Sequence, residues 1–248
     1  MDRLIYVAMN GAKHAMEKQA TVSNNLANAS TTGFKAQLDA FRALPSYGPG
    51  AGTRTYVMDT EVGTDFSFGS IQTTGRPLDV AVNGKGWIAV QGRDGREAYT
   101  RDGNIQLSPN GVMQTRDGLN LLGEGGGPIT VPPNSQVAVA PDGTVSVVPQ
   151  DSTPNAVNIV GRIKLVNPPE KDLVRGGDGL FQQTNGQPAP ADASVALAPA
   201  SLESSNVSAV ESLVSMMTHT RQFETQIKLI QTAEAMFREL GQVISMNG

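Results

Sequence analysis

Few residues of this chain have the type and spacing that a chemical site requires. The chain has two histidines, His14 and His219, and no cysteine. Neither histidine has a second ligand at the H-x-x-x-H spacing of a helical zinc site, so we expect no metal site. The lack of cysteine excludes disulfides and thiolate chemistry.

Carboxylates are more numerous, and a pair of them could supply the acid and base of a glycosidase. Five aspartates directly precede a glycine, however, which is typical of tight turns. These are Asp94, Asp102, Asp117, Asp142 and Asp178. The glycine-rich run Gly123–Gly127 could cradle a phosphate, but no Gly-Lys-Ser/Thr follows it. The sequence therefore predicts turns at these positions, no catalytic residue and no cofactor.

The composition favours turns and short strands over a dense aromatic core. Of the 248 residues, 27 are glycine and 15 are proline, whereas only 5% are aromatic. The net charge of −4 is small, which disfavours a nucleic-acid partner. No stretch reaches the roughly 20 apolar residues that cross a bilayer, so we expect no membrane insertion. Lys13 and Glu17 interrupt the N-terminal apolar positions, so we expect no cleaved signal peptide.

Both ends of the chain have the apolar period of a helix. Apolar positions recur three or four residues apart in residues 1–36, and residues 201–248 show the same period with larger side chains. We interpret the positions on these two stripes as subunit-interaction residues. They are Ile5, Ala8, Ala12, Ala15, Val22, Leu26, Phe223, Ile227, Ile230, Phe237, Leu240 and Ile244.

The start of the second helix has its own signals. Ser205 or Asn206 is suited to cap it, because Ser and Asn side chains accept hydrogen bonds from the free N–H groups of a first turn. Val207, Val210, Leu213 and Met217 are expected to extend the apolar stripe toward that start.

Two arrangements of these helices are open. Each can pack on its own domain, or the two can associate as a coiled-coil-like helical domain. The alanine-rich first helix buries little area and would be marginal alone in water. Residues 1–36 carry four basic and two acidic residues, net +2, and residues 201–248 carry three basic and five acidic, net −2. This complementarity favours association, because opposite charges help to set partner and orientation.

The middle of the chain has the pattern of short strands separated by tight turns. Six Asn-Gly or Asp-Gly dipeptides between residues 83 and 143 are typical of hairpin turns, because both residue types tolerate a positive φ. Trp87 is expected in the core of an antiparallel β domain. The runs that predict its strands are Leu78–Val82, Trp87–Gln91, Ile105–Leu107, Val137–Ala140 and Val145–Val148.

These patterns divide the chain into four regions and predict the α+β class, with terminal helices around a mainly antiparallel β domain. Leu38, Phe41 and Leu44 could also prolong the first helix, and Pro188–Pro199 has the composition of an exit linker. The expected regions are an N-terminal helix in 1–36, an extended linker in 37–75, a β-rich body in 76–200 and a C-terminal helix in 201–248.

One segment near the end of the first helix is more specific than the rest. Residues 23–35 read SNNLANASTTGFK. The asparagines weaken helix propensity and Gly33 is suited to ending a helix, so on physical grounds the segment is a cap and turn. The motif residues are Asn24, Asn25, Leu26, Ala27, Asn28, Gly33 and Phe34.

The same segment resembles the N-terminal signature of the bacterial flagellar rod and hook proteins, an N-N-L-A-N-x-x-T-x-G-F-K-like run. Gly75–Gly84, followed by Gly86-Trp87 and Tyr99–Gly103, resembles the start of the β domain of that family. Asn206-Val207 and Phe223–Thr225 resemble its terminal helix. The matches stand in the order of the family and span effectively the whole chain. Thr32 is a departure, since many relatives have Asn there.

The resemblance implies a structural subunit of the flagellar basal-body rod and not an enzyme. The terminal helices would polymerise with other rod subunits and with copies of the same chain into an inner, torque-transmitting tube, with the β domain outside. The chain would be exported by the flagellar type III apparatus without a cleaved signal peptide and reside in the basal body, within the periplasm. The opening residues 1–12 and the modest length favour the subunit between proximal and distal rod, with the distal-rod subunit as the nearest alternative.

Another class of function stays open at this point. A periplasmic β-domain enzyme acting on peptidoglycan, with the helices as anchors, is the second hypothesis. Release of cell-wall fragments by the purified protein separates the two. An adhesin or a needle-type component of another secretion system is a third hypothesis, which the N-N-L-A-N run disfavours.

Overall fold

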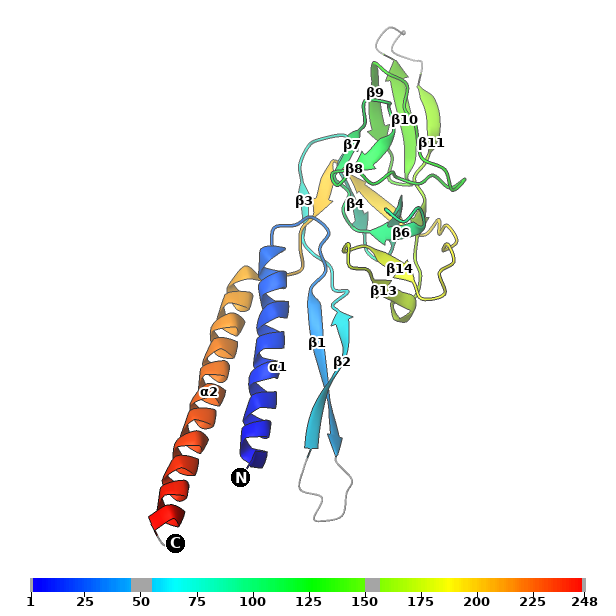
Figure 1. Ribbon diagram of the computed structural model, residues 1–248. Coiled ribbons are helices and arrows are strands. Elements are labelled where there is room, and N and C mark those ends of the chain that lie inside the picture. Colours follow the sequence, from blue (N-terminus) through cyan, green and yellow to red (C-terminus); the bar gives the residue numbers. More distant parts are fainter. Residues whose placement is uncertain (1, 46–54, 150–156, 247–248) are drawn as a thin grey trace. The chain divides into compact units, whose positions relative to one another are not determined.

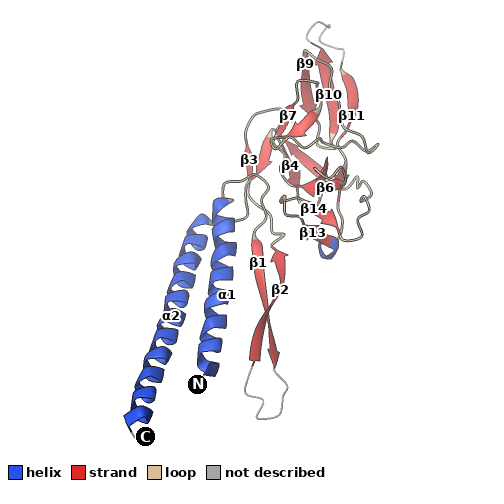
Figure 2. Ribbon diagram, in the orientation of Figure 1, coloured by secondary structure: helices blue, strands red, loops and turns tan. Residues whose placement is uncertain are grey.

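The computed structural model describes residues 2–45, 55–149 and 157–246. Two long α-helices form the ends of this chain, and β-strands fill the region between them (Figure 1, Figure 2). All strand pairings among the described residues are antiparallel. The predicted α+β class is therefore confirmed.

The helices are α1 (Asp2–Ala27) and α2 (Ala209–Met246). A short 3-10 helix spans Glu170–Asp172. The strands are β1 (Gln37–Pro45), β2 (Thr55–Thr64), β3 (Ile71–Thr73), β4 (Val80–Asn83), β5 (Trp87–Gln91), β6 (Glu97–Thr100), β7 (Ile105–Leu107), β8 (Met113–Thr115), β9 (Ser135–Val139), β10 (Thr144–Pro149), β11 (Asn158–Arg162), β12 (Leu165–Val166), β13 (Leu173–Arg175), β14 (Phe181–Gln183), β15 (Ala196–Pro199) and β16 (Ser201–Glu203).

The chain divides into two compact units. We call the first the helical unit; it consists of Met1–Ala29, Ala36–Asp65 and Val207–Gly248. The second, the body, consists of Ser30–Lys35 and Phe66–Asn206. The chain therefore crosses between the units four times. Apart from the short segment 30–35, the body runs from residue 66 to residue 206, whereas the sequence-based region runs from 76 to 200.

Both helices are shorter than the sequence suggested. The helix α1 ends at Ala27 instead of 36, where the asparagine-rich segment turns, as its propensities indicate. The helix α2 begins at Ala209 instead of 201. The expected caps Ser205 and Asn206 are wrong, because Ser208 holds that position and its Oγ accepts the Glu211 N–H at 3.3 Å. Ser208 and Glu211 have the S-x-x-E spacing of a capping box.

The segment that follows α1 is a hairpin of the helical unit. Strands β1 and β2 pair along their length, from Gln37 opposite Thr64 to Pro45 opposite Thr55. The extended character expected for residues 37–75 is present in β1, β2 and β3, while residues 46–54 lie outside the described part of the chain. The alternative that Leu38, Phe41 and Leu44 prolong the first helix is wrong, because all three belong to β1.

The body is built on a five-stranded sheet of order β12-β5-β6-β14-β13 and a three-stranded sheet of order β11-β10-β9. Its main core consists of aliphatic side chains such as Ile88, Val90 and Ile105, which are fully buried. A second cluster surrounds Trp87, whose ring centroid lies 4.7 Å from that of Phe181. The prediction that Trp87 anchors the core is confirmed.

Two sequence interpretations of the body are wrong. The segment Pro188–Pro199 is not an exit linker, since its last residues form β15, which pairs with β4 and buries Leu197. Asp102-Gly103 does not form a positive-φ turn as the other five dipeptides do. A Cβ on Gly103 would lie 1.6 Å from the Val80 carbonyl oxygen, so this glycine permits a close strand approach instead.

Candidate functional site

The two helices of the helical unit lie side by side, with the start of α1 and the end of α2 at the same end of the pair (Figure 1). They are therefore antiparallel. Gly11 of α1 faces Gln226 of α2, and a Cβ on Gly11 would lie 2.9 Å from the Gln226 Cδ. Ala8, Ala12 and Ala15 are buried, as is Ala233 of α2. Small residues thus let the two backbones approach closely.

The expected subunit-interaction residues gather along this intrachain seam. Ala8, Ala12 and Ala15 are buried within the single chain, whereas the larger residues keep part of their surface in solvent. The half-buried ones are Ile5, Val22, Leu26, Phe223, Ile227, Ile230 and Phe237. The side chains of Leu240 and Ile244 lie outside the described residues.

A different set of apolar side chains is left exposed. Val210, Leu213, Val214 and Met217 recur at helical spacing on α2 with exposed fractions of 73%, 48%, 53% and 56%. These four side chains are more exposed than the half-buried seam residues such as Phe223, so they lie outside the seam. The expectation that Val210, Leu213 and Met217 extend the seam is therefore wrong. On α1, Tyr6, Met9 and Met16 are likewise exposed.

One motif residue connects α1 to the hairpin. The side-chain amide of Asn25 donates to the Gln37 carbonyl oxygen at 2.9 Å, and its Oδ1 accepts the Gln37 N–H at 2.9 Å. Asn25 thus bonds both backbone groups of Gln37, as a neighbouring strand would. The Thr21 hydroxyl adds a bond to Asp39 at 2.7 Å. These bonds fix where β1 begins relative to α1.

The end of the motif belongs to the body. Gly33 has φ +67°, and a Cβ there would lie 2.3 Å from the Arg101 carbonyl carbon, so only glycine fits. Its N–H donates to the Glu203 carbonyl oxygen at 2.8 Å. Phe34 is buried beneath the guanidinium of Arg175, which lies 4.5 Å from the ring centroid. The Asn206 N–H donates to the Phe34 carbonyl oxygen.

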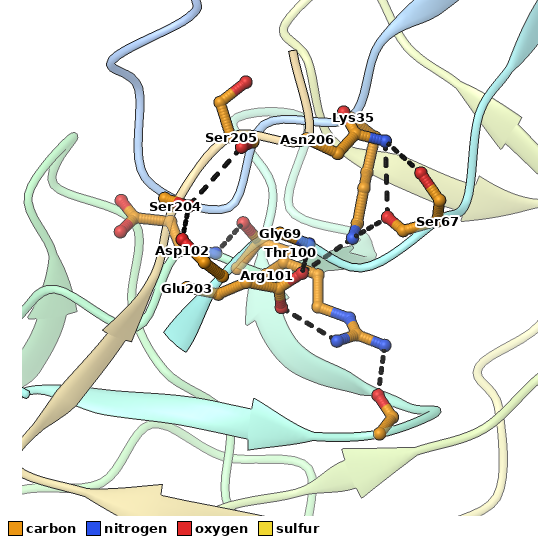
Figure 3. A network of polar contacts seen from close by, with 12 residues as sticks. Lys35, Ser67, Gly69, Thr100, Arg101, Asp102, Glu203, Ser204, Ser205 and Asn206 are labelled. Atoms are coloured by element: carbon orange, nitrogen blue, oxygen red, sulfur yellow. Dashed lines mark hydrogen bonds and ion pairs between the residues drawn. The ribbon is translucent and has the colours of Figure 1, made fainter. Parts of the chain in front are cut away.

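Next to Phe34 lies a buried group of charges, Lys35, Arg101 and Glu203, which we call the clasp (Figure 3). The Lys35 Nζ lies 2.7 Å from one Glu203 oxygen, and the Arg101 guanidinium lies 2.8 Å from the other. These side chains are 1%, 3% and 1% exposed for Lys35, Arg101 and Glu203. Charges this deep in a protein are stable only when they are paired and hydrogen-bonded.

Both cations of the clasp also bond the backbone, whereas the buried Nε of Arg101 has no hydrogen-bond partner among the described residues. Lys35 donates to the Ser67 carbonyl oxygen, and Arg101 donates to the Gly84 carbonyl oxygen, both at 2.7 Å. The Gly69 N–H donates to Glu203 at 3.0 Å. The clasp thereby joins the segments around residues 35, 68, 101 and 203.

Two cations face one carboxylate, and aromatic rings accommodate the excess positive charge. The Phe68 ring lies 5.6 Å from the Lys35 Nζ and 5.2 Å from the Arg101 Cζ, and Trp87 lies 5.3 Å from the same carbon. Burial raises the pKa of Glu203, but the hydrogen bond from Lys35 and the charges of both cations outweigh it and lower that pKa below its usual range.

Comparisons with known proteins match three segments of the chain to families of flagellar proteins. A family described as "Flagella basal body rod protein" matches residues 5–35, the "Flagellar hook protein FlgE/F/G D1 domain" matches 81–147, and "Flagellar basal body rod FlgEFG protein C-terminal" matches 198–243. The chain is 43% identical to the flagellar basal-body rod protein FlgF of Salmonella typhimurium over 100% of both chains.

The chain belongs to the flagellar basal-body rod protein family. It is a structural subunit of the rod of the basal body, and the identity to FlgF confirms the resemblance seen in the sequence. FlgF of Caulobacter vibrioides is 36% identical over 94% of this chain and 95% of the relative. FlgG of Bacillus subtilis, named as a rod protein too, is 30% identical over 97% of this chain and 98% of the relative. The peptidoglycan-enzyme hypothesis has no support among these relatives, which are rod proteins.

The three matched segments of this rod protein each contribute one clasp residue. Lys35 ends the first match, Arg101 lies in the second and Glu203 in the third. The motif list taken from the sequence stopped at Phe34 and so missed the clasp. The alternation of β16 carried a signal, because Ser201 and Glu203 are buried while Leu202 between them is not. A charge on the inner side of a strand needs a partner.

The turn interpretation of the aspartates is confirmed for Asp94, Asp142 and Asp178, whereas Asp102 makes the same local bond without a tight turn. Oδ1 of Asp94, Asp102, Asp142 and Asp178 each accepts the N–H two residues later. Asp102 differs electrostatically, because its burial, reinforced by the charge of Asp117, raises its pKa to about 6 although the Asn104 N–H opposes the shift.

Other chemistry of the rod protein is limited in the part that the structure describes. No group of three or more His, Asp or Glu side chains there could hold a metal ion. None of the described helices combines the length and apolar character that a membrane span needs. A cavity of about 460 Å³ is lined by Glu97 and Lys164 among others, and both carboxylate oxygens of Glu97 accept from the Lys164 Nζ, at 2.9 and 2.7 Å.

Proposed function

We propose that the helical unit is the assembly module of this rod subunit and that it polymerises into a torque-transmitting tube. The observation that carries the proposal is the apolar surface that the helix pair leaves uncovered. Val210, Leu213, Val214 and Met217 place a continuous apolar stripe in solvent, outside the seam with the partner helix. Burying such a surface against neighbouring subunits releases roughly 25 cal/mol per Å² of apolar area.

The seam and the exposed stripe have different roles in this proposal. The seam sets the two helices side by side within one chain, through buried alanines and the close approach at Gly11. The half-buried seam residues, such as Ile227 and Ile230, still present surface to a neighbour. Neighbouring rod subunits and further copies of this chain are the partners, and the resulting structure has a coiled-coil-like packing.

The remaining parts of the proposal concern export and location. The chain is exported by the flagellar type III apparatus without a cleaved signal peptide, and its place in the basal body lies within the periplasm, between the proximal and distal rod. The full-length similarity to proteins named FlgF supports that position over the distal rod. The charged residues Lys13 and Glu17 within α1 support the expectation of no cleaved signal.

The test is a pair of charge substitutions on the exposed stripe in the full chain. Leu213→Asp with Met217→Asp should abolish rod incorporation and swimming, because two carboxylates would have to be buried against a neighbour. Since both positions are exposed in the single chain, the purified variant should retain its circular dichroism spectrum.

Two further variants locate the interface. Ile227→Asp with Ile230→Asp, on the seam, should also stop swimming but should in addition lower the helical signal. Ile159→Asp is the matched control, because Ile159 is a 73% exposed apolar residue of the body; it should leave swimming intact. Normal swimming of cells that carry only the Leu213/Met217 variant would contradict the assigned face.

A further inference from the structure

The clasp joins residues that are unusually far apart in the chain. Lys35 and Glu203 are separated by 168 positions, and Arg101 and Glu203 by 102. By contrast, Glu97 and Lys164, which form another buried ion pair of the body, are separated by 67. A chain of 248 residues must therefore have most of its length available before the clasp can form.

Glu203 is the residue on which the clasp depends. Its carboxylate meets Lys35, Arg101 and the Gly69 N–H, and its carbonyl oxygen accepts the Gly33 N–H. Without Glu203, two buried cations would face each other with no counter-charge. A partly folded body that has buried Lys35 and Arg101 but not yet received Glu203 is thus strongly disfavoured.

The strands next to Glu203, β15 and β16, are also the last strands in the sequence. The strand β16, which ends at Glu203, pairs with β3, and β15 pairs with β4. The first strands of the body thus receive their partners from its last residues. Antiparallel pairing and charge compensation are completed by the same short segment, residues 196–206.

We propose that the clasp is a folding gate, which keeps the body unfolded until the whole span from Lys35 to Glu203 is free to come together. The consequence for export rests on the proposed function. Whichever end of the chain enters a narrow channel first, either Lys35 or Glu203 leaves the channel while the other of the two is still inside it. The body then folds only after almost the entire chain has passed through, which prevents a folded body from blocking the channel.

The gate is tested by following the full chain during synthesis, with translation arrested at stepwise lengths and folding measured by the force on the arrest peptide or by protease resistance. For the wild type, we expect one onset of folding, which appears only at lengths where residue 203 has left the ribosomal tunnel. Onset at lengths where β14 has emerged but Glu203 has not would overturn the proposal.

A variant without charges tests whether the clasp, and not the late strands alone, sets that length. The triple variant Lys35→Met, Arg101→Met and Glu203→Gln buries no charge at the clasp before the chain is complete. The side-chain oxygen of the substituted glutamine can still accept the Gly69 N–H. Folding should begin at shorter lengths than in the wild type. An unchanged onset would assign the delay to β15 and β16 and overturn the gate. If this variant does not fold, a wild-type onset before Glu203 has emerged still overturns the gate, because the clasp is then not needed for folding to begin.

The matched control removes the other buried ion pair. Glu97→Gln with Lys164→Met should leave the onset length unchanged, since both residues emerge well before Glu203. An onset that shifts as much as in the uncharged clasp would overturn the proposal. Failure of the export proposal is seen separately, as absence of the chain from the fraction secreted by the flagellar apparatus, while the onset lengths stay as stated.

Discussion

The helical unit and the body bury different kinds of side chain. Among the described residues of the helical unit, the apolar residues that are buried are alanines: Ala8, Ala12, Ala15 and Ala233. The body buries large aliphatic side chains completely, including Ile88, Ile105 and Leu121. An alanine removes little apolar area from water, whereas a buried isoleucine or leucine contributes about 1.5–3 kcal/mol.

This difference separates a region that stabilises itself from one that depends on neighbours. Ordering the backbone opposes folding by about 1–2 kcal/mol per residue in either region. In the body, dense apolar packing and a paired clasp offset that entropy. In the helical unit, residues such as Met217 and Tyr6 remain in solvent, and their burial against other subunits supplies the missing free energy.

The largest expected effect comes from the same substitution made in both units. Ile88→Ala should destabilise the body by about 2–5 kcal/mol, because Ile88 is fully buried. Ile5→Ala, at a half-buried position of α1, should change the unfolding of the body by less than about 0.5 kcal/mol. The measurement is urea unfolding followed by the fluorescence of Trp87, the one tryptophan of the chain. Equal shifts for both variants would mean that the two units unfold together.

A second comparison uses two glycines. Gly33→Ala should destabilise the body by about 2 kcal/mol or more, because φ is +67° and the added Cβ meets the backbone of Arg101. Gly11→Ala should stay within about 1 kcal/mol of the wild type in either direction, since the gain in helix propensity opposes the displacement of the flexible Gln226 side chain. Thermal unfolding of both variants checks this order. A Gly11→Ala variant with the larger loss would contradict the flexible contact.

The smallest effect concerns Asp102 and pH. Its pKa rises from 3.8 to about 6 in the body, so the folded body binds this proton more tightly than the unfolded chain does. The associated stability is fully present below pH of about 4 and is lost as pH rises through about 6. Asp102→Asn can keep the bond to the Asn104 N–H and should stabilise the body by about 1–2 kcal/mol at pH 7.

At pH 4 the same Asp102→Asn substitution should have little effect, because the aspartate is then protonated. Urea unfolding at the two pH values checks the difference. A destabilised variant at pH 7 would show that the carboxylate is favourable in its charged form.

Local patterns predicted the elements of this chain better than they predicted its boundaries. The strand Trp87–Gln91 and the two helices follow from alternation and helical period, which depend on near neighbours. The charge balance of the chain ends was interpreted as a contact between helices. Lys35 and Glu203 do pair, but in the body, and no local pattern contains a pairing over 168 positions.

The same limit applies to the site. The motif residues Asn25 and Gly33 were found from the sequence, but their roles depend on Gln37 and on the backbone of Arg101. Boundaries at residues 36 and 201 would remove Lys35 and Glu203 and leave Arg101 buried without a counter-charge. A fragment meant to contain the body should therefore run from residue 30 to residue 206.

Hydrogen exchange on the purified monomer and on assembled rods tests most directly whether the helical unit depends on its neighbours. In the monomer, we expect the amides of α1 to exchange orders of magnitude faster than those of β4 and β5, because the alanine seam contributes little against the ordering of the backbone. In assembled rods, α1 should become protected while β4 and β5 change little. Equal protection of α1 and β5 in the monomer would show that the helices are stable before assembly and would contradict the dependence on neighbouring subunits.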